Sequence, residues 1–176
     1  MTVGGVRPGG STLLESAFVA NSADLLSYFG RRVCVPADAA DLLGETFLIA
    51  TRRVQRMPST PEEGRMWLFG IARRVLANSN RSIVRHASLV AKLQERLRTL
   101  PTEQPDVEAL DVRAALEALP AGQSELVRLV LWDGFTLPEA AAILGVSEST
   151  ARGRYQRARA KLAAILGEQR YERISR

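Results

Sequence analysis

The sequence predicts an all-α protein of two small helical domains joined by a flexible linker, the second of which contains a helix-turn-helix. Aromatic residues make up only 6% of the 176 residues, and runs of β-branched residues are few. Ala, Leu and Arg, which are good helix formers, recur along the whole chain. Apolar residues repeat at helical spacing on both sides of a stretch, RTLPTEQPD, that is polar and carries two prolines.

The first predicted domain spans residues 13–85 and follows a Gly-rich tail, residues 1–12, that we expect to be disordered. Helical periodicity begins near Leu13 and continues to Arg32, before Pro36 interrupts it. The apolar residues of this helix that we expect in the core are Leu13, Leu14, Phe18, Leu25, Leu26 and Phe29.

A second helix, predicted over residues 37–54, has two distinct faces. Asp38, Asp41 and Glu45 share one face, and side chains of like charge at this spacing repel each other. The acidic face indicates a basic protein partner, although a merely solubilising face remains an alternative. The residues near Leu43 on the opposite, apolar face are Ala39, Thr46, Phe47 and Ala50.

A third helix is predicted over residues 62–85, after a loop at residues 58–61 that contains two prolines. One face is apolar and is expected to be buried through Trp67, Leu68, Ile71 and Val75. Basic and amide side chains on the other face suit an unpaired nucleic-acid strand, although an ordinary solvated face explains them equally well. These side chains are Arg73, Arg74, Asn78, Asn80, Arg81 and Arg85.

The second predicted domain spans residues 108–170, after a linker at residues 86–107 and before a tail at residues 171–176. Two breaks, LPAGQ at residues 119–123 and WDGF at residues 132–135, divide the domain. They predict three helices before a long final one.

A helix-turn-helix is predicted from Thr136 onward. Thr136 and Glu139 have the spacing of a capping box at the start of a short helix, and Pro138 fits its first turn. Gly145 supplies a left-handed turn residue, and Ser147 can cap the next helix. This order of helix, tight turn and capped helix is typical of DNA-binding proteins.

The last helix has an apolar stripe and a polar face. The stripe consists of Ala151, Tyr155, Ala158, Leu162 and Ile165, and the opposite face carries Ser149, Arg152, Gly153, Gln156 and Arg157. Arg and Gln can contact guanine and adenine edges in the major groove. Arg154, Arg159 and Lys161 flank this face and are expected near phosphates. A solvated helix closing a bundle is the alternative.

The net charge of +5 comes from an excess of basic residues near the C-terminus. Residues 147–176 contain eight basic and three acidic side chains. Residues 111–144 contain two basic and five acidic ones. A basic segment of this kind favours a partner that carries phosphates.

Other classes of protein are disfavoured by what the chain lacks. Cys34 is the only cysteine and His86 the only histidine, so we expect no internal disulfide, no metal site and no cofactor. Cys34 itself is a small buried apolar residue or, as a weaker hypothesis, a redox-sensitive one. No apolar run reaches the roughly 18–20 residues that span a bilayer, and the N-terminus lacks a signal-peptide core, so we expect a cytoplasmic protein.

Three segments resemble, in order and spacing, the extracytoplasmic-function (ECF) sigma factors of bacterial RNA polymerase. The segments are DAADLLGETFL, WLFGIARRVL and LPAGQSELVRLVLWDGFTLPEAAAILGVSESTARGRYQRARAKL. The resemblance spans residues 13–166 and implies a non-enzymatic initiation factor without catalytic residues. Residues 13–85 would be sigma region 2 and residues 108–170 sigma region 4.

The resemblance also implies a role for each surface. Region 2 would bind the clamp helices of the largest polymerase subunit through Asp38, Asp41, Leu42, Glu45 and Phe47. The loop at residues 57–64 and the third helix would read the −10 element, with Met57, Arg65, Arg73, Arg74, Asn78 and Arg81 as candidate contacts. Region 4 would read the −35 element through Ser147, Ser149, Thr150, Arg152, Gly153, Gln156 and Arg157.

Further partners follow from the resemblance alone. Region 4 would also dock on the flap of the second-largest subunit, and the linker would enter the active-site cleft. An anti-sigma protein is an expected inhibitor. Two other hypotheses remain open at this point. One is a free-standing helix-turn-helix regulator, and the other is an enzyme or signalling domain fused to a DNA-binding tail.

Overall fold

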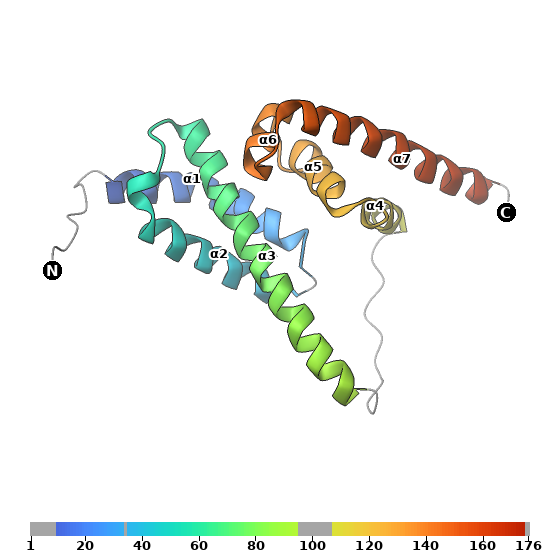
Figure 1. Cartoon of the computed structure of the whole chain (residues 1–176), viewed down its shortest axis with the longest axis horizontal. Coiled ribbons are helices and arrows are strands. Elements are labelled where there is room, and N and C mark those ends of the chain that lie inside the picture. The colour runs from blue at the N-terminus through green and yellow to red at the C-terminus, as the bar shows by residue number, and fades with distance from the viewer. Residues whose placement is uncertain (1–9, 34, 95–106, 175–176) are drawn as a thin grey trace. The chain divides into compact units, whose positions relative to one another are not determined.

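The computed structural model describes the backbone of residues 10–33, 35–94 and 107–174, and it is helical in all three ranges apart from turns (Figure 1). Side chains are described for residues 12–33, 35–81 and 112–167. The chain divides into two compact units, unit 1 at residues 1–98 and unit 2 at residues 99–176. The predicted fold class is thereby confirmed.

In the described part of unit 1, three long helices pack against one another in pairs and are accompanied by one short 3-10 helix. The helices begin where local chemistry favours a start. Pro36 opens α2, because a first-turn residue needs no N–H donor. Thr60 caps the next long helix, since its hydroxyl accepts from the Glu63 backbone N–H at 3.4 Å. The elements are α1 (Gly10–Gly30), α2 (Pro36–Arg52), η1 (Val54–Arg56) and α3 (Pro61–Gln94).

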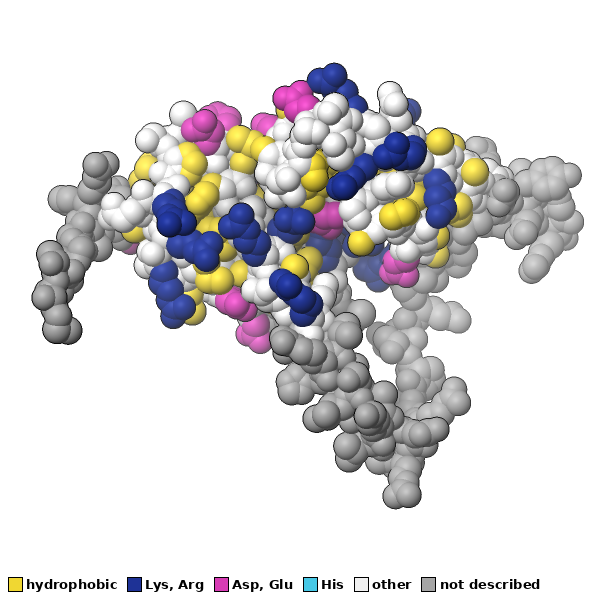
Figure 2. All heavy atoms as spheres, in the orientation of Figure 1, with side chains coloured by type: hydrophobic (Ala, Val, Ile, Leu, Met, Phe, Trp, Pro, Cys, Tyr) yellow, Lys and Arg dark blue, Asp and Glu magenta, His cyan; other side chains and the backbone are white. Residues whose placement is uncertain are grey.

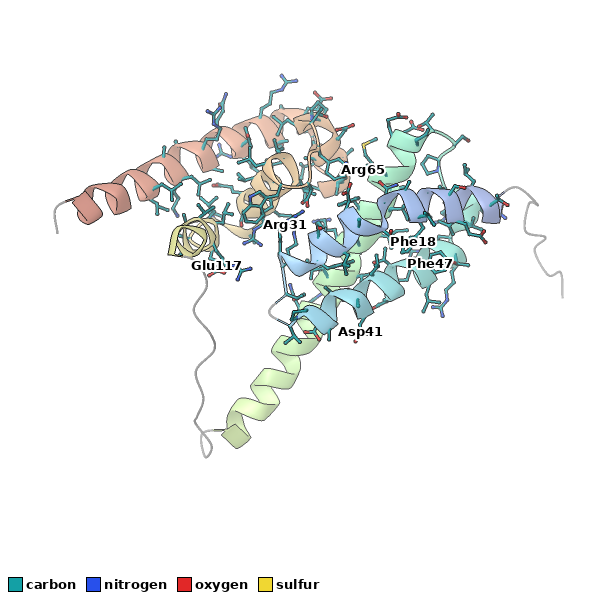
Figure 3. The ribbon with its side chains drawn as sticks, turned by 180° about the vertical axis from the view of Figure 1, so that it is seen from behind. Phe18, Arg31, Asp41, Phe47, Arg65 and Glu117 are labelled. Atoms are coloured by element: carbon teal, nitrogen blue, oxygen red, sulfur yellow. The ribbon has the colours of Figure 1, made fainter. Side chains whose placement is uncertain are left out.

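Aromatic side chains fill the core of unit 1. Tyr28 is fully buried and lies edge-on to Phe69, with ring centroids 5.5 Å apart, and to Phe29 at 5.3 Å. Phe18 of α1 faces Phe47 of α2 at 4.7 Å, so a second aromatic pair joins these two helices (Figure 3). Such pairs add to the apolar burial that stabilises the unit.

Four residues expected in the core of unit 1 are only partly buried, and Phe18 is one of them. Leu13 is 42% exposed and Leu26 is 43% exposed, whereas Leu14 and Leu25 are buried. Successive residues of a helix are turned by about 100°, so a neighbour of a buried position can lie off the inward stripe although it is apolar. The same reason applies to Trp67, which is half-buried next to the fully buried Leu68.

Helix ends differ from the predictions by a few residues, with one larger difference. We expected the third helix to end at Arg85, whereas α3 continues to Gln94. Residues 86–94, HASLVAKLQ, contain neither Pro nor Gly, so nothing in the backbone chemistry ends the helix there. The tail expected at residues 1–12 also overlaps α1, which begins at Gly10. Residues 95–106 of the predicted linker lie outside the described residues.

Over residues 107–174, unit 2 contains three short helices and a long final one, as predicted. They are α4 (Val107–Glu117), α5 (Ala121–Leu131), α6 (Leu137–Leu144) and α7 (Glu148–Ile174), and the first three all contact α7. Leu116, Leu119 and Val127 form a buried cluster with Ala158 of α7. Because Ala158 and Ala151 are small and wholly buried, α7 can lie close to its neighbours.

No described helix is long and apolar enough to cross a membrane.

Candidate nucleic-acid interface

The first helix of the predicted helix-turn-helix is held at its start by a capping box. The Thr136 backbone N–H donates to Glu139 Oε2 at 2.7 Å, and the Glu139 N–H donates to Thr136 Oγ1 at 3.4 Å. Two donors at the helix start are therefore satisfied reciprocally. This capping box was predicted from the sequence and is confirmed.

The turn after α6 depends on a left-handed glycine. Gly145 has φ 69° and ψ 37°. Its N–H donates to the Ala142 carbonyl at 3.1 Å, and the Val146 N–H donates to the Ala141 carbonyl at 3.0 Å. This pair of bonds is the Schellman arrangement, which stops α6 and redirects the chain into α7.

Three hydroxyl side chains gather at the start of α7. Ser147 Oγ accepts from the Thr150 backbone N–H at 3.2 Å and donates to Thr150 Oγ1 at 2.8 Å. Ser149 Oγ lies 3.1 Å from Ser147 Oγ. Ser147 therefore caps α7, and all three hydroxyl residues are exposed where the helix begins.

The face of α7 opposite the core presents the residue types that read bases. Arg152, Gln156 and Arg157 are exposed, and Gly153 lies half-buried among them. Arg152 also forms an ion pair with Glu148, from Nη2 to Oε2 at 3.0 Å. The structure thus brings these four of the five predicted face residues together on one surface, which we call the reading face of α7; the fifth, Ser149, is exposed at the start of the helix.

Arg154, Arg159 and Lys161 were expected to be available for phosphates. Two of these three side chains instead contact other parts of unit 2. Lys161 Nζ donates to the Ala118 carbonyl at 2.8 Å and so caps the C-terminal end of α4. The guanidinium of Arg154 lies against Gly122, where a Cβ atom would meet its Nη1 at 3.3 Å. Sequence alone cannot show these contacts, because their partners lie more than 30 residues away. Arg159 is exposed as expected.

Unit 1 carries a second basic surface, a groove of about 370 Å³ between α2 and α3. Four candidate contacts to the −10 element line it, and Arg81 Nη2 donates to Asn78 Oδ1 at 2.8 Å within this set. Ile49 of α2 and Arg53, directly after α2, also line the groove. Both were missed, because only the fold places them beside α3. Figure 2 shows Lys and Arg side chains gathered over this part of unit 1. We call it the arginine groove, and its polar members are Arg53, Arg73, Arg74, Asn78 and Arg81.

Two other residues expected to contact the −10 element lie elsewhere. Arg65 Nη2 pairs with Asp24 Oδ2 of α1 at 3.1 Å, and its guanidinium lies 5.0 Å from the ring centre of Phe69. Met57 is half-buried, and its Cε is the nearest atom to a Cβ that would be added at Gly64, at 3.5 Å. Neither residue lines the arginine groove.

The acidic face of α2 is open to solvent along its length. Asp38, Asp41 and Glu45 are all exposed, and Figure 3 shows Asp41 on the outer side of the helix. We call these three residues the acidic stripe. Leu48, 57% exposed, extends the same face by one turn and was not singled out from the sequence.

The two apolar residues named with these carboxylates as polymerase contacts, Leu42 and Phe47, point away from the acidic face. Leu42 is only 5% exposed, and Phe47 packs on Phe18. They therefore pack beneath the acidic stripe instead of lying on it.

Some expectations fall on residues that the structure does not describe. Cys34 and the side chains of Arg85 and His86 lie outside the described residues. Among the side chains that are described, no group of three or more His, Cys, Asp and Glu residues is placed to hold a metal ion.

Comparison with known proteins decides between the hypotheses. The ECF RNA polymerase sigma factor EcfG of Rhodopseudomonas palustris is 34% identical over 130 residues, which are 73% of this chain and 71% of that protein. The chain belongs to the ECF sigma factors. The RNA polymerase sigma factor CarQ of Myxococcus xanthus is 31% identical over 169 residues, 92% of this chain and 94% of CarQ. The family described as Sigma-70, region 4, matches residues 109–162.

The fold of this sigma factor is also similar to solved structures. RpoE of Bartonella quintana, solved in complex with the anti-sigma factor NepR, has a TM-score of 0.63 at 23% identity. The similarity covers 87% of this chain and 96% of RpoE.

As an ECF sigma factor, the protein directs promoter-specific transcription by RNA polymerase. CarQ matches nearly the whole chain, whereas a free-standing regulator or a fused enzyme would share the helix-turn-helix alone.

Proposed function

We propose that the sigma factor works through three separate surfaces. The acidic stripe binds core RNA polymerase, the arginine groove holds the −10 element, and the reading face of α7 contacts the −35 element in the major groove. The reading face is the observation that carries the proposal. It exposes Arg152, Gln156 and Arg157. The caps at the starts of α6 and α7 and the glycine turn between the two helices hold this face in position.

The arginine groove suits a strand that has left the duplex. Its arginines can neutralise phosphates along one strand, and Ile49 adds an apolar surface for an unstacked base. Extruding a base from the stack costs on the order of a few kcal/mol. Contacts that form only with the opened strand offset part of this cost and so favour the melted promoter.

The acidic stripe suits a basic partner that is not nucleic acid. Carboxylates that are exposed on one helix face repel phosphates but complement a basic protein surface. Leu48 adds an exposed apolar contact at the end of the stripe. We therefore place the clamp of the largest polymerase subunit on this face, and the flap of the second-largest subunit on unit 2.

The sigma factor is proposed to act by binding alone, without an enzymatic step, in the bacterial cytoplasm where polymerase and DNA are found. We also propose an anti-sigma protein as its inhibitor. The similarity to RpoE of Bartonella quintana, which was solved with NepR bound, supports this partner.

Reconstituted transcription tests the proposal. Core polymerase with the purified protein is expected to initiate at a defined start site on genomic templates, whereas core polymerase alone is not. Footprinting of the same complexes is expected to protect two separate elements upstream of the start. Tight binding of the protein alone to duplex promoter DNA, with no initiation after core polymerase is added, would instead support a free-standing regulator.

A further inference from the structure

An acidic side chain lies at the edge of the reading face of α7. Glu148 occupies the first turn, and its Oε2 accepts from Arg152 Nη2 at 3.0 Å. Both side chains are well exposed, 57% for Glu148 and 67% for Arg152. A carboxylate here approaches the phosphates of any DNA that α7 contacts, which disfavours binding.

Capping does not account for Glu148. In a capping box the acidic residue is the third of the helix, as Glu139 is in α6. In α7 that place is taken by Thr150, whose N–H and hydroxyl both bond to Ser147. Glu148 is instead engaged with Arg152, one helical turn further along the reading face.

A guanidinium has several N–H donors arranged along two edges. When Glu148 accepts from one nitrogen of Arg152, the contact favours one orientation of the guanidinium and leaves other donors for a guanine edge. An Arg152 without this partner is free to turn to the nearest phosphate, which carries no sequence information. The carboxylate therefore disfavours contacts to phosphate more than contacts to a base.

We infer that Glu148 is a specificity-determining residue of the −35 contact, which weakens binding to DNA in general and directs Arg152 to a guanine. The inference rests on the proposed function of α7. It concerns a residue that was not among the candidate −35 contacts, all of which are neutral or basic.

The experiment uses holoenzyme and a promoter whose −35 segment is randomised, with bound and unbound sequences read out. Glu148→Ala is expected to relax the preference at the one position that Arg152→Ala also relaxes. The affinity of the Glu148→Ala holoenzyme for poly(dI-dC) is expected to rise several-fold. The slope of its log affinity against log salt concentration is expected to steepen by about 1, the equivalent of one added phosphate contact. In an Arg152→Ala background, Glu148→Ala is expected to leave the base preference unchanged.

Two further variants separate this role from a structural one. Glu117→Ala removes the same charge from an exposed site on α4 and is expected to leave both the preference and the poly(dI-dC) affinity unchanged. Glu148→Asp keeps the charge at the start of α7 but shortens the reach to Arg152, so an intermediate relaxation is expected. If circular dichroism shows that Glu148→Ala does not fold, Glu148→Asp is the variant that tests the inference.

The outcomes show separately whether the role of Glu148 fails and whether the proposed −35 contact of α7 fails. If the wild-type holoenzyme shows no sequence preference in the −35 segment, the proposed function of α7 is overturned. A selective wild type that is relaxed by Arg152→Ala but unaffected by Glu148→Ala and Glu148→Asp would overturn the role of Glu148 alone. Weaker binding of Glu148→Ala to all sequences would also overturn it, because that result indicates a stabilising role.

Discussion

At the scale of single residues, the angle between α6 and α7 depends on one backbone conformation. Gly145 has a positive φ, which places any side chain close to the following carbonyl oxygen. Its amide and that of Val146 complete the Schellman bonds, so the conformation cannot be relaxed without losing them. The reading face is thus positioned by a residue that has no side chain.

Gly145→Ala is expected to destabilise unit 2 by about 1–2 kcal/mol, because alanine is strained in the left-handed region. Urea unfolding followed by Trp132 fluorescence, in a Trp67→Phe background, measures this change. Gly44→Ala is the matched control. Gly44 is exposed inside α2 with open space around it, so the expected change there is a slight stabilisation of unit 1, followed by Trp67 fluorescence in a Trp132→Phe background. Equal effects of the two substitutions would contradict this account of the turn.

Individual arginines of unit 1 look alike in the sequence but differ in their surroundings. Arg65 is paired with Asp24, whereas Arg53 lines the arginine groove. An arginine that neutralises a phosphate contributes about one unit to the salt dependence of binding, and an arginine paired within the protein contributes little.

Arg53→Ala is expected to weaken binding of holoenzyme to a fork-junction DNA with a single-stranded −10 segment. The loss should be equal for different −10 sequences, and the slope of log affinity against log salt should fall by about 1. Titrations at several salt concentrations measure both quantities. Arg65→Ala serves as the control and is expected to leave the slope unchanged. The same loss of slope in both variants would mean that Arg65 leaves Asp24 when DNA binds.

At the scale of helices, α7 serves two functions on opposite faces. Ala151 and Ala158 are fully buried towards the other helices of unit 2, while Arg152 and Gln156 are exposed. The small residues allow close packing, and that packing holds the reading face in a defined direction.

Ala158→Leu is expected to destabilise unit 2 by about 1–3 kcal/mol, since extra methylenes must be forced into a filled core. Ala160→Leu adds the same side chain at an exposed position of α7 and is expected to change stability little. Urea unfolding of both variants gives the comparison. A tolerated leucine at Ala158 would indicate space at the contact of α7 with its neighbours.

At the scale of the whole molecule, the acidic stripe stands out from an otherwise basic chain. The protein carries a net charge of +5, yet three carboxylates stand together on α2. A uniformly basic surface would bind DNA non-specifically. In the function we propose, the separate acidic stripe allows polymerase and DNA to bind different faces at the same time.

Charge reversal of the acidic stripe, as Asp41→Arg with Glu45→Arg, is expected to abolish binding to core polymerase while the helical circular dichroism signal stays unchanged. Both side chains are exposed, so the fold does not depend on them. Co-purification with core polymerase measures the loss. Glu62→Arg reverses an exposed acid on α3, outside the acidic stripe, and is the control for charge reversal as such. Normal holoenzyme formation by the double variant would rule out the proposed interface.

The sequence determined the helices, their caps and the faces of α7, because these depend on residues within a few positions of one another. The capping box at Thr136, the turn at Gly145 and the cap at Ser147 all stand as predicted. The order of three helices before a long final one was predictable for the same reason.

Tertiary structure alone decided which polar side chains are available to an external partner and which contact other parts of the protein. Lys161 caps α4 and Arg65 pairs with α1, while Arg53 joins the arginine groove. Each of these outcomes depends on a partner that is distant in the chain and near in space. Helical periodicity shows the direction of a side chain, but only the packed neighbour shows whether a charge in that direction meets solvent or an oppositely charged group.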